Sequence, residues 1–309
     1  MNGLRCPVEG TALEAAAGVL RCVDGHTFSV VDGIPVLLDP TVPPTQEGYW
    51  ATGEEVYPSE ELPQPVGDDV DQYVRWLLRG TCGNLFDGER VSQYPIPAFP
   101  LAGPGRLLDI GSNWGRWSIA AARVGFDVVA IDPSLGAMRA ARRVARQLDV
   151  DLDVIVADAR HAPFPDGSFD VVFSYSVLQH LAPADVKECA EECARLLRPG
   201  GVALHQLPNA YGARSVYRQA ARRFRAPAGF EVRYWKPRQL RALFGEAVGP
   251  TVLSVDGFLT LNPHPGVEGL LPWRSRGVVE TSRALTRLSC HAPFLERVAD
   301  SLWVHSTRR

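Results

Sequence analysis

Three acidic residues stand at the ends of apolar runs, each one strand–helix unit apart. Asp109 lies within LLDIG, Asp132 closes VVAID, and Asp158 follows DVIVA. Gly111 and Gly115 come after the first of them, and an Ala-rich helical pattern follows. In a parallel α/β sheet such strand ends meet at one edge, where backbone N–H groups at a helix N-terminus approach a ligand closely. This pattern predicts a nucleotide-like ligand, with the Asp132 carboxylate bonding two ribose hydroxyls.

Two further motifs follow in the same order along the chain. PFPDGSFDVVFSYSVLQHL predicts a fourth strand unit, and LLRPGGVALHQLPN predicts a helix stop followed by a fifth strand. Taken together, residues 106–209 resemble a class I S-adenosylmethionine-dependent methyltransferase of the type-11 group, which includes ubiquinone-biosynthesis-like and sugar or natural-product enzymes. The resemblance implies S-adenosylmethionine as the methyl donor and S-adenosylhomocysteine as the product.

The resemblance also implies which residues contact this cofactor. The glycine-rich turn holds the methionine portion, with Asn113 in place of the middle glycine. Asn tolerates left-handed backbone angles better than most residues. The implied cofactor contacts are Asp109, Gly111, Asn113, Gly115, Asp132, Pro133, Asp158, Ala159, Ser174 and Tyr175. Each carboxylate also has a structural alternative: Asp109 capping a turn, Asp132 capping the helix from Ser134, and Asp158 as a loop residue.

The chemistry implied is transfer of a methyl group from a sulfonium to a nucleophile, for which the protein mainly supplies alignment in a water-poor site. A base is needed only when the acceptor must lose a proton, as a hydroxyl does. His180, in LQHL after the fourth strand, is the predicted base. Its alternative is a structural histidine that bonds a backbone carbonyl. His264 ranks behind it, and His205 is interpreted as a buried strand residue.

The fold class expected from the resemblance is α/β, with a Rossmann-like sheet of seven strands in the order 3-2-1-4-5-7-6 and strand 7 antiparallel. Residues 1–40 read as a small β-rich module, residues 41–67 as a Pro-rich linker, and residues 68–309 as the methyltransferase domain. Within that domain the core motifs occupy residues 106–209. Residues 262–301 are expected to be a C-terminal insertion with a helix near residues 278–288.

The N-terminal module carries a pattern with metal-ligand spacing. Cys6 and Glu9 are followed by Cys22 and His26. This pattern resembles a zinc ribbon, and the module is similar to the methyltransferase-activator family. Structural zinc sites use four closely held ligands, so the resemblance predicts zinc on these four residues. The alternative is a metal-free ribbon that is packed by apolar residues and holds buried free thiols.

Composition and charge limit the kinds of partner that the protein can have. The chain has no apolar stretch near the ~20 residues that span a membrane, and its six irregularly spaced cysteines do not suggest a disulfide framework, so we expect a cytoplasmic enzyme. The net charge is −10 over residues 1–100 and +9 over residues 201–309. Because the ribbon-like module lies in the acidic third, nucleic acid is an unfavourable partner.

The predicted acceptor is therefore a small molecule, methylated on an oxygen of a sugar, glycolipid or secondary metabolite. Two other classes stay open. The chain could be an RNA methyltransferase that uses its N-terminal module for RNA, or a non-catalytic protein that keeps the cofactor pocket. The sequence does not indicate an oligomeric state.

Overall fold

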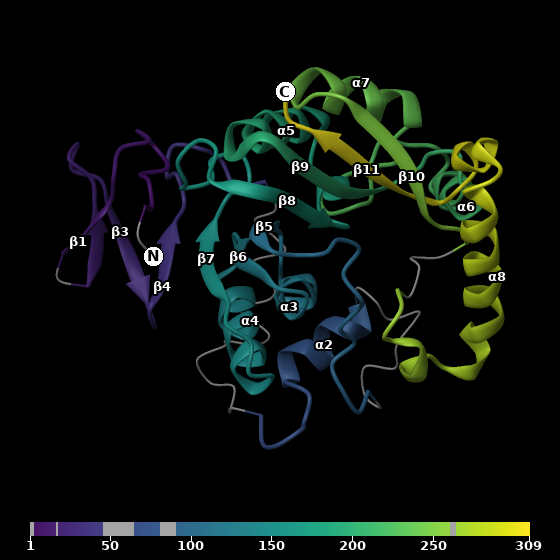
Figure 1. Ribbon diagram of the computed structural model, residues 1–309, viewed down its shortest axis with the longest axis horizontal. Coiled ribbons are helices and arrows are strands. Elements are labelled where there is room, and N and C mark those ends of the chain that lie inside the picture. The colour runs from purple at the N-terminus through teal and green to yellow at the C-terminus, as the bar shows by residue number, and fades with distance from the viewer. Residues whose placement is uncertain (1–2, 17, 46–64, 81–90, 260–263) are drawn as a thin grey trace.

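The alternating apolar strands and amphipathic helices fold into one mixed sheet with helices on both faces (Figure 1). The computed structural model describes residues 3–16, 18–45, 65–80, 91–259 and 264–309. The strands are β1 (Glu14–Ala16), β2 (Val19–Arg21), β3 (Thr27–Val31), β4 (Ile34–Leu37), β5 (Gly105–Ile110), β6 (Phe126–Asp132), β7 (Asp153–Ala157), β8 (Phe169–Tyr175), β9 (Leu197–Pro208), β10 (Thr251–Gly257) and β11 (Ser301–Thr307). The α-helices are α2 (Gln72–Gly80), α3 (Arg116–Arg123), α4 (Leu135–Gln147), α5 (Pro183–Leu196), α6 (Ala213–Ala221), α7 (Pro237–Ala247) and α8 (Trp273–Ser289). The short 3-10 helices are η1 (Leu178–His180), η2 (Glu268–Leu270) and η3 (Pro293–Arg297).

The strand order across the described sheet is β1-β2-β3-β4-β7-β6-β5-β8-β9-β11-β10. Strands β7, β6, β5, β8 and β9 run parallel, whereas β11 is antiparallel to both β9 and β10. The expected α/β class is confirmed. Strands β5–β11 have the expected order 3-2-1-4-5-7-6, with the last strand antiparallel, but the described sheet has eleven strands because the N-terminal module is joined to it.

The additional four strands come from the N-terminal module, which extends the sheet instead of standing apart from it. Strand β4 pairs in parallel with β7, with Val36 opposite Val156 and Leu37 opposite Ala157. Strand β4 is apolar on both faces, and Ile34 and Leu37 are fully buried. Joining the β7 edge removes this apolar surface from water and gives the backbone of β7 hydrogen-bond partners.

Two layers of helices bury the two faces of the sheet. Helices α2, α3 and α4 pack on one face, and α5 and α7 pack on the other (Figure 1). Along β8 the side chains alternate between these layers, with Phe173 in the cluster that contains α3 residues and Val172 in the cluster that contains α5 residues. The alternation decides which face each functional side chain of the strand reaches.

The glycine-rich turn between β5 and α3 is shaped by left-handed backbone angles. Gly111 has φ 66°, Asn113 has φ 49° and Gly115 has φ 82°. The expectation that Asn113 accepts a left-handed conformation is confirmed. A Cβ on Gly111 would lie 2.6 Å from the side chain of Val177, because the loop after β8 passes directly over the end of β5. The turn therefore requires glycine at this position for space as well as for conformation.

The C-terminal insertion lies between β10 and β11 and contains η2, α8 and η3. Helix α8 begins five residues before the expected range. Residues 262–263 of the predicted insertion and residues 46–64 of the predicted linker lie outside the described residues. None of the helices in the described part of the chain combines the length and apolarity that crossing a bilayer requires.

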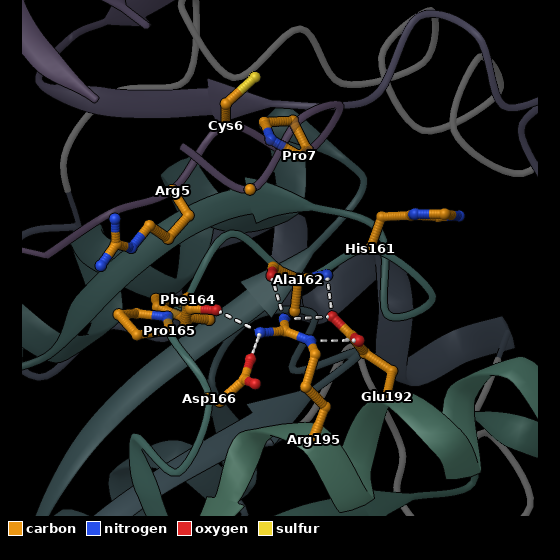
Figure 2. Close-up of a pocket in the computed structure, with 11 residues that line it drawn as sticks. Arg5, Cys6, Pro7, His161, Ala162, Phe164, Pro165, Asp166, Glu192 and Arg195 are labelled. Atoms are coloured by element: carbon orange, nitrogen blue, oxygen red, sulfur yellow. Dashed lines mark hydrogen bonds and ion pairs between the residues drawn. The ribbon is translucent and has the colours of Figure 1, made fainter. Parts of the chain in front are cut away.

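A cavity of about 510 Å³ lies where the module meets the loop after β7 (Figure 2). Arg195 of α5 closes one side of it, with its guanidinium bound to the carboxylates of Glu192 and Asp166 and to two backbone carbonyls of the loop. Cys6 points its sulfur away from this cluster. None of the predicted cofactor contacts lines this cavity, so we assign it to the module–domain junction.

Candidate active site

Asp109 lies in β5 beneath the glycine-rich turn and is almost completely buried, with 2% of its surface exposed. Its Oδ2 accepts a hydrogen bond of 2.6 Å from Oγ of Ser118, which lies in the first turn of α3. Burial raises the pKa of Asp109 to about 7, and the nearby charge of Asp132 acts in the same direction. The residue thus carries a desolvated carboxyl whose charge a ligand can compensate.

Asp132 ends β6, the neighbouring strand, and is 6% exposed. Its Oδ2 accepts from the backbone N–H of Asn113 at 3.1 Å, and its Oδ1 accepts from the backbone N–H of Ser134 at 3.0 Å. Burial raises its pKa to about 6. Each carboxylate oxygen offers two lone pairs, so both oxygens retain capacity for a ligand hydroxyl.

The helix that follows does not depend on Asp132 for its cap. Ser134 is the N-cap of α4, and its Oγ accepts from the backbone N–H of Ala137 at 3.2 Å. Pro133 links the strand end to this cap. Among the described residues neither Asp109 nor Asp132 forms an ion pair. The two carboxyl groups therefore lie at adjacent strand ends beside the glycine-rich turn without a cation.

Asp158, the third predicted carboxylate, is in a different environment. Its Oδ1 accepts from Nε of Arg160 at 3.1 Å, and its Oδ2 accepts from Nη2 at 2.8 Å. Arg160 also bonds Asp185 at 3.1 Å and the carbonyl of Pro43 at 2.8 Å. Both oxygens of Asp158 therefore hold a guanidinium, which matches the loop-carboxylate interpretation of this residue. Ala159 follows in the same turn and is half-buried.

Ser174 and Tyr175 end β8 and point to opposite faces of the sheet. Ser174 is fully buried toward the α5 layer, where its Oγ lies 2.8 Å from Nδ1 of His205. Nε2 of His205 is 3.8 Å from Sγ of Cys193, and burial lowers the pKa of His205 to about 3. The side chain of Ser174 thus belongs to an interior cluster, whereas Tyr175 faces the α3 layer.

The predicted base His180 is fixed by both of its ring nitrogens. Nδ1 lies 2.7 Å from the carbonyl of Phe230, and Nε2 lies 3.1 Å from Nε2 of Gln179. The ring stacks on Phe230 with 3.8 Å between ring centroids. Burial lowers its pKa to about 4. This arrangement matches the structural alternative, in which the histidine donates to a backbone carbonyl.

A polar network that the sequence motifs did not include joins four strand ends. Asp256 of β10 is 2% exposed, and its Oδ2 accepts from Oγ of Ser301 at 2.6 Å and from Oη of Tyr175 at 3.2 Å. Ser301 in turn accepts from Nε2 of Gln206 at 2.6 Å. His264 brings Nε2 to 3.3 Å from Oδ1 of Asp256. The sequence analysis named Tyr175 and His264 singly, whereas Asp256, Ser301 and Gln206 were missed because no motif marks them.

Aromatic rings surround this network on the α3 side of the sheet. The ring of Tyr175 lies 4.6 Å from that of Trp117 and 5.5 Å from that of Trp303, measured between centroids. His264 packs edge-on against Trp117 at 4.8 Å. Burial raises the pKa of Asp256 to about 6. The network is therefore enclosed by apolar surface, in which polar contacts are stronger than in water.

Three of the four predicted metal ligands are gathered in the module. Sγ of Cys6, Sγ of Cys22 and a ring nitrogen of His26 all lie within 4.8 Å of one another. Nδ1 of His26 is 3.8 Å from Sγ of Cys6 and 3.5 Å from Sγ of Cys22. Tetrahedral zinc with ordinary Zn–S and Zn–N distances gives edges of about 3.6 Å between such ligands, so the three residues fit zinc. Glu9 is exposed and is not part of this group, so the four-ligand set is wrong in that residue.

A family model described as a methyltransferase domain matches residues 108–205. This stretch contains the second half of β5, the glycine-rich turn, Asp109 and Asp132, the whole of β8 and most of β9. These residues therefore form a methyltransferase domain, and the methyltransferase resemblance read from the motifs of residues 106–209 is confirmed.

The chain is similar to ubiquinone biosynthesis O-methyltransferases. The protein from Rhizobium johnstonii is 36% identical over 114 residues, which cover 37% of this chain and 45% of that protein. The protein from Caulobacter vibrioides is 34% identical over 149 residues, which cover 46% and 58%. A crystal structure of a SAM-dependent methyltransferase from Methanosarcina mazei is 17% identical, with a TM-score of 0.49, and covers 69% of this chain and 99% of that one. The chain thus spans about half the length of the curated relatives it matches.

Proposed function

We propose that this protein binds S-adenosylmethionine at the ends of β5 and β6 and transfers its methyl group to an oxygen of a small-molecule acceptor. The similarity to ubiquinone biosynthesis O-methyltransferases supports oxygen as the acceptor atom. In the transfer the acceptor oxygen forms a bond to the methyl carbon, the carbon–sulfur bond breaks, and its electron pair stays on the sulfur of S-adenosylhomocysteine. Because the leaving sulfide is neutral, alignment and exclusion of water are the main tasks of the protein.

The observation that carries this proposal is the pair of buried carboxyl groups beside the left-handed turn. Asp109 and Asp132 each lack an ion pair among the described residues, and burial raises the pKa of both. A ligand that brings hydroxyls and a cationic ammonium compensates this desolvation. We propose that Asp132 accepts from the ribose hydroxyls and that the turn from Gly111 to Gly115 surrounds the methionine portion of the cofactor.

Calorimetric titration with S-adenosylhomocysteine tests the cofactor site. Asp132→Ala removes the proposed ribose acceptor, and we expect the dissociation constant to rise about 30-fold, the effect of losing charged hydrogen bonds worth roughly 2 kcal/mol. Asp127→Ala is the matched control, because Asp127 lies on the same strand with a largely exposed side chain. No heat from the wild-type protein, or equal affinities for the wild type and Asp132→Ala, would contradict the proposal.

His180 enters this proposal as a positioning residue of the loop after β8. Its ring holds the carbonyl of Phe230 and the amide of Gln179, so it fixes that loop against residues 229–235. We expect His180→Ala to retain methyl transfer at saturating cofactor. A loss of turnover with unchanged cofactor affinity would instead assign His180 the role of base that its sequence position suggested.

For the N-terminal module we propose zinc held by Cys6, Cys22 and His26, with water as its fourth ligand. When bound, zinc would cross-link the start of the chain to the β2–β3 turn and stabilise the strands that extend the sheet. Metal analysis of protein purified without chelator is expected to find one zinc per chain. Cys22→Ser is expected to lose the metal, whereas Cys290→Ser, at an exposed thiol, is the matched control that retains it. A wild-type protein without stoichiometric zinc would contradict this assignment.

A further inference from the structure

The network beside Tyr175 contains a histidine–aspartate pair that the proposed cofactor contacts do not use. Nε2 of His264 lies 3.3 Å from Oδ1 of Asp256 and 3.1 Å from Oη of Tyr175. His264 belongs to the segment between β10 and β11, outside the matched methyltransferase domain. The tertiary fold has therefore added a titratable pair to the strand ends that the family motifs define.

Hydrogen bonding within the network fixes the proton arrangement of His264. Oη of Tyr175 donates its proton to Oδ2 of Asp256, and Oδ1 of Asp256 lies 3.3 Å from Nε2 of His264. Tyr175 can therefore only accept from Nε2 of His264, 3.1 Å away, which selects the tautomer in which Nε2 carries the proton. The lone pair of the neutral ring then lies on Nδ1. Within the described part of the chain, Nδ1 of His264 has no hydrogen-bond partner.

The pair also lies on the correct side of the cofactor site. Tyr175 is the last residue of β8, whose neighbour β5 leads directly into Gly111. Asp256 and Ser301 lie at the same edge, because β10 ends there and the antiparallel β11 begins there. Tyr175, one of the implied cofactor contacts, thus connects the proposed cofactor site directly to the pair.

Burial and two nearby arginines keep the ring of His264 neutral. Burial lowers the pKa of His264, and the guanidiniums of Arg116 from α3 and Arg283 from α8 act in the same direction. The groups that face it from β8 and β10 are Tyr175 and Asp256. A neutral imidazole is a weak base here, but an oxygen that is gaining a methyl group becomes strongly acidic. A weak base therefore suffices when proton removal accompanies methyl transfer.

Resting on the proposed methyl transfer, we propose that Asp256 and His264 form the base of the acceptor side and that the acceptor is a hydroxyl compound. The acceptor oxygen attacks the methyl carbon, and Nδ1 of His264 takes the proton that this oxygen releases. The carbon–sulfur electron pair leaves on S-adenosylhomocysteine. The carboxylate of Asp256 stabilises the imidazolium that forms, in the way that a buried aspartate supports a catalytic histidine.

Kinetics with a defined hydroxyl probe test this assignment. Catechol is incubated with methyl-labelled S-adenosylmethionine and the full-length chain, and the methylated product is counted. General-base catalysis contributes roughly 10²–10⁴-fold, so we expect His264→Ala to lower kcat about 100-fold or more. Its affinity for S-adenosylhomocysteine should stay within about threefold of the wild type, and added imidazole should restore part of the rate. His305→Ala, at an exposed histidine of β11, is the matched control and should leave kcat unchanged.

A second measurement does not depend on the acceptor. Nitrogen NMR of protein that carries ¹⁵N-labelled histidine and binds S-adenosylhomocysteine reports the tautomer of His264. The signals of His264 are identified because they are absent from the spectrum of His264→Gln. We expect the proton on Nε2, and we expect Asp256→Asn to remove that preference. A proton on Nδ1, or wild-type kcat in His264→Ala, overturns the proposal.

The outcomes separate this inference from the function on which it rests. Protein that binds no S-adenosylhomocysteine contradicts the proposed function itself. Protein that binds it and methylates benzylamine but not catechol keeps methyl transfer and overturns the hydroxyl acceptor. If neither probe is methylated by cofactor-binding protein, the tautomer decides: Nε2 protonation that Asp256→Asn abolishes supports the pair, and any other state overturns it.

Discussion

Two regions of the carboxyl edge of the sheet carry the same sequence signal and differ in chemistry. At the ends of β5 and β6, Asp109 and Asp132 are buried among neutral donors, and burial raises the pKa of both. At the end of β7, Asp158 lies against Arg160, which binds both of its oxygens. The first region holds carboxyl groups that lack a counter-charge in the described structure. In the second region Arg160 supplies the counter-charge for Asp158.

The difference shows that an acidic residue at a strand end predicts the position of the carboxyl group but not whether it binds a ligand or stabilises the fold. A buried carboxyl without a cation is destabilised by desolvation, so a ligand with a positive charge or hydroxyl donors gains affinity there. A carboxylate that already binds a guanidinium contributes to folding instead. Four measurements test whether the first region serves ligand binding and the second serves stability.

The largest effect is expected from Asp158→Asn. The side chains of Asp158 and Arg160 are 13% and 7% exposed, so the change leaves a buried guanidinium with Asp185 as its remaining carboxylate. Breaking a buried pair in this manner costs about 3 kcal/mol of the free energy of unfolding, measured by urea denaturation. Asp166→Asn, which breaks a largely exposed pair with Arg195, is the control and should cost less than about 1 kcal/mol. Equal effects would remove the distinction between a structural and a surface carboxylate.

Asp109→Asn is expected to act on binding. The amide oxygen can still accept from Ser118, but the charge is gone, so the dissociation constant for S-adenosylhomocysteine should rise about 30-fold, or roughly 2 kcal/mol. The same titration of Asp158→Asn should stay within about threefold of the wild type. If Asp158→Asn weakened binding as much as Asp109→Asn, the third strand end would belong to the cofactor site after all.

The affinity should also depend on pH. The pKa of Asp132 is about 6 and that of Asp109 about 7 in the free protein, so both carboxyls are mostly ionised at pH 8 and mostly protonated at pH 5. If the cofactor binds the ionised forms, its affinity should fall about tenfold or more over that interval, because each group must release its proton. Calorimetry across the interval measures the slope, and Asp109→Asn should make it shallower. A pH-independent affinity would show that neither charge is used.

The smallest effect is on the stability of the ligand-free protein. The pKa of Asp109 is raised in the folded state, so its stabilising contribution is complete below pH 4 and is lost as the pH rises through 7. At pH 8 the wild type therefore carries a buried charge that Asp109→Asn lacks. We expect the variant to be more stable than the wild type at pH 8 and to lose this advantage at pH 4. Thermal unfolding at the two pH values checks the sign.

The central sheet and the position of the glycine-rich turn could be predicted from the sequence because both depend on local patterns. The apolar runs before Asp109 and Asp132 define strands, and the spacing of Gly111 and Gly115 defines the turn, since few residues accept left-handed angles. The conformation of Asn113 was predictable for the same reason. The grouping of Cys6, Cys22 and His26 could be predicted because their spacing resembles that of metal ligands in a zinc ribbon.

Other features depend on residues far apart in the chain. The guanidinium of Arg160 has the spacing to reach Asp158, but its further contacts with Asp185 and Pro43 come from other elements. His264 meets Asp256 and Tyr175 only because β10 and β11 bring the C-terminal segment beside β8. The burial of β4 against β7 likewise joined a module that its composition had set apart.

The sequence by itself determined which backbone turns form and which residue types stand at the strand ends, because φ preferences and side-chain periodicity act over a few neighbouring residues. Only the tertiary structure decided what each of those side chains faces. The raised pKa values of Asp109 and Asp256 come from desolvation, and Asp256 finds its partners Tyr175, Ser301 and His264 in distant segments, so neither has a signature in local sequence.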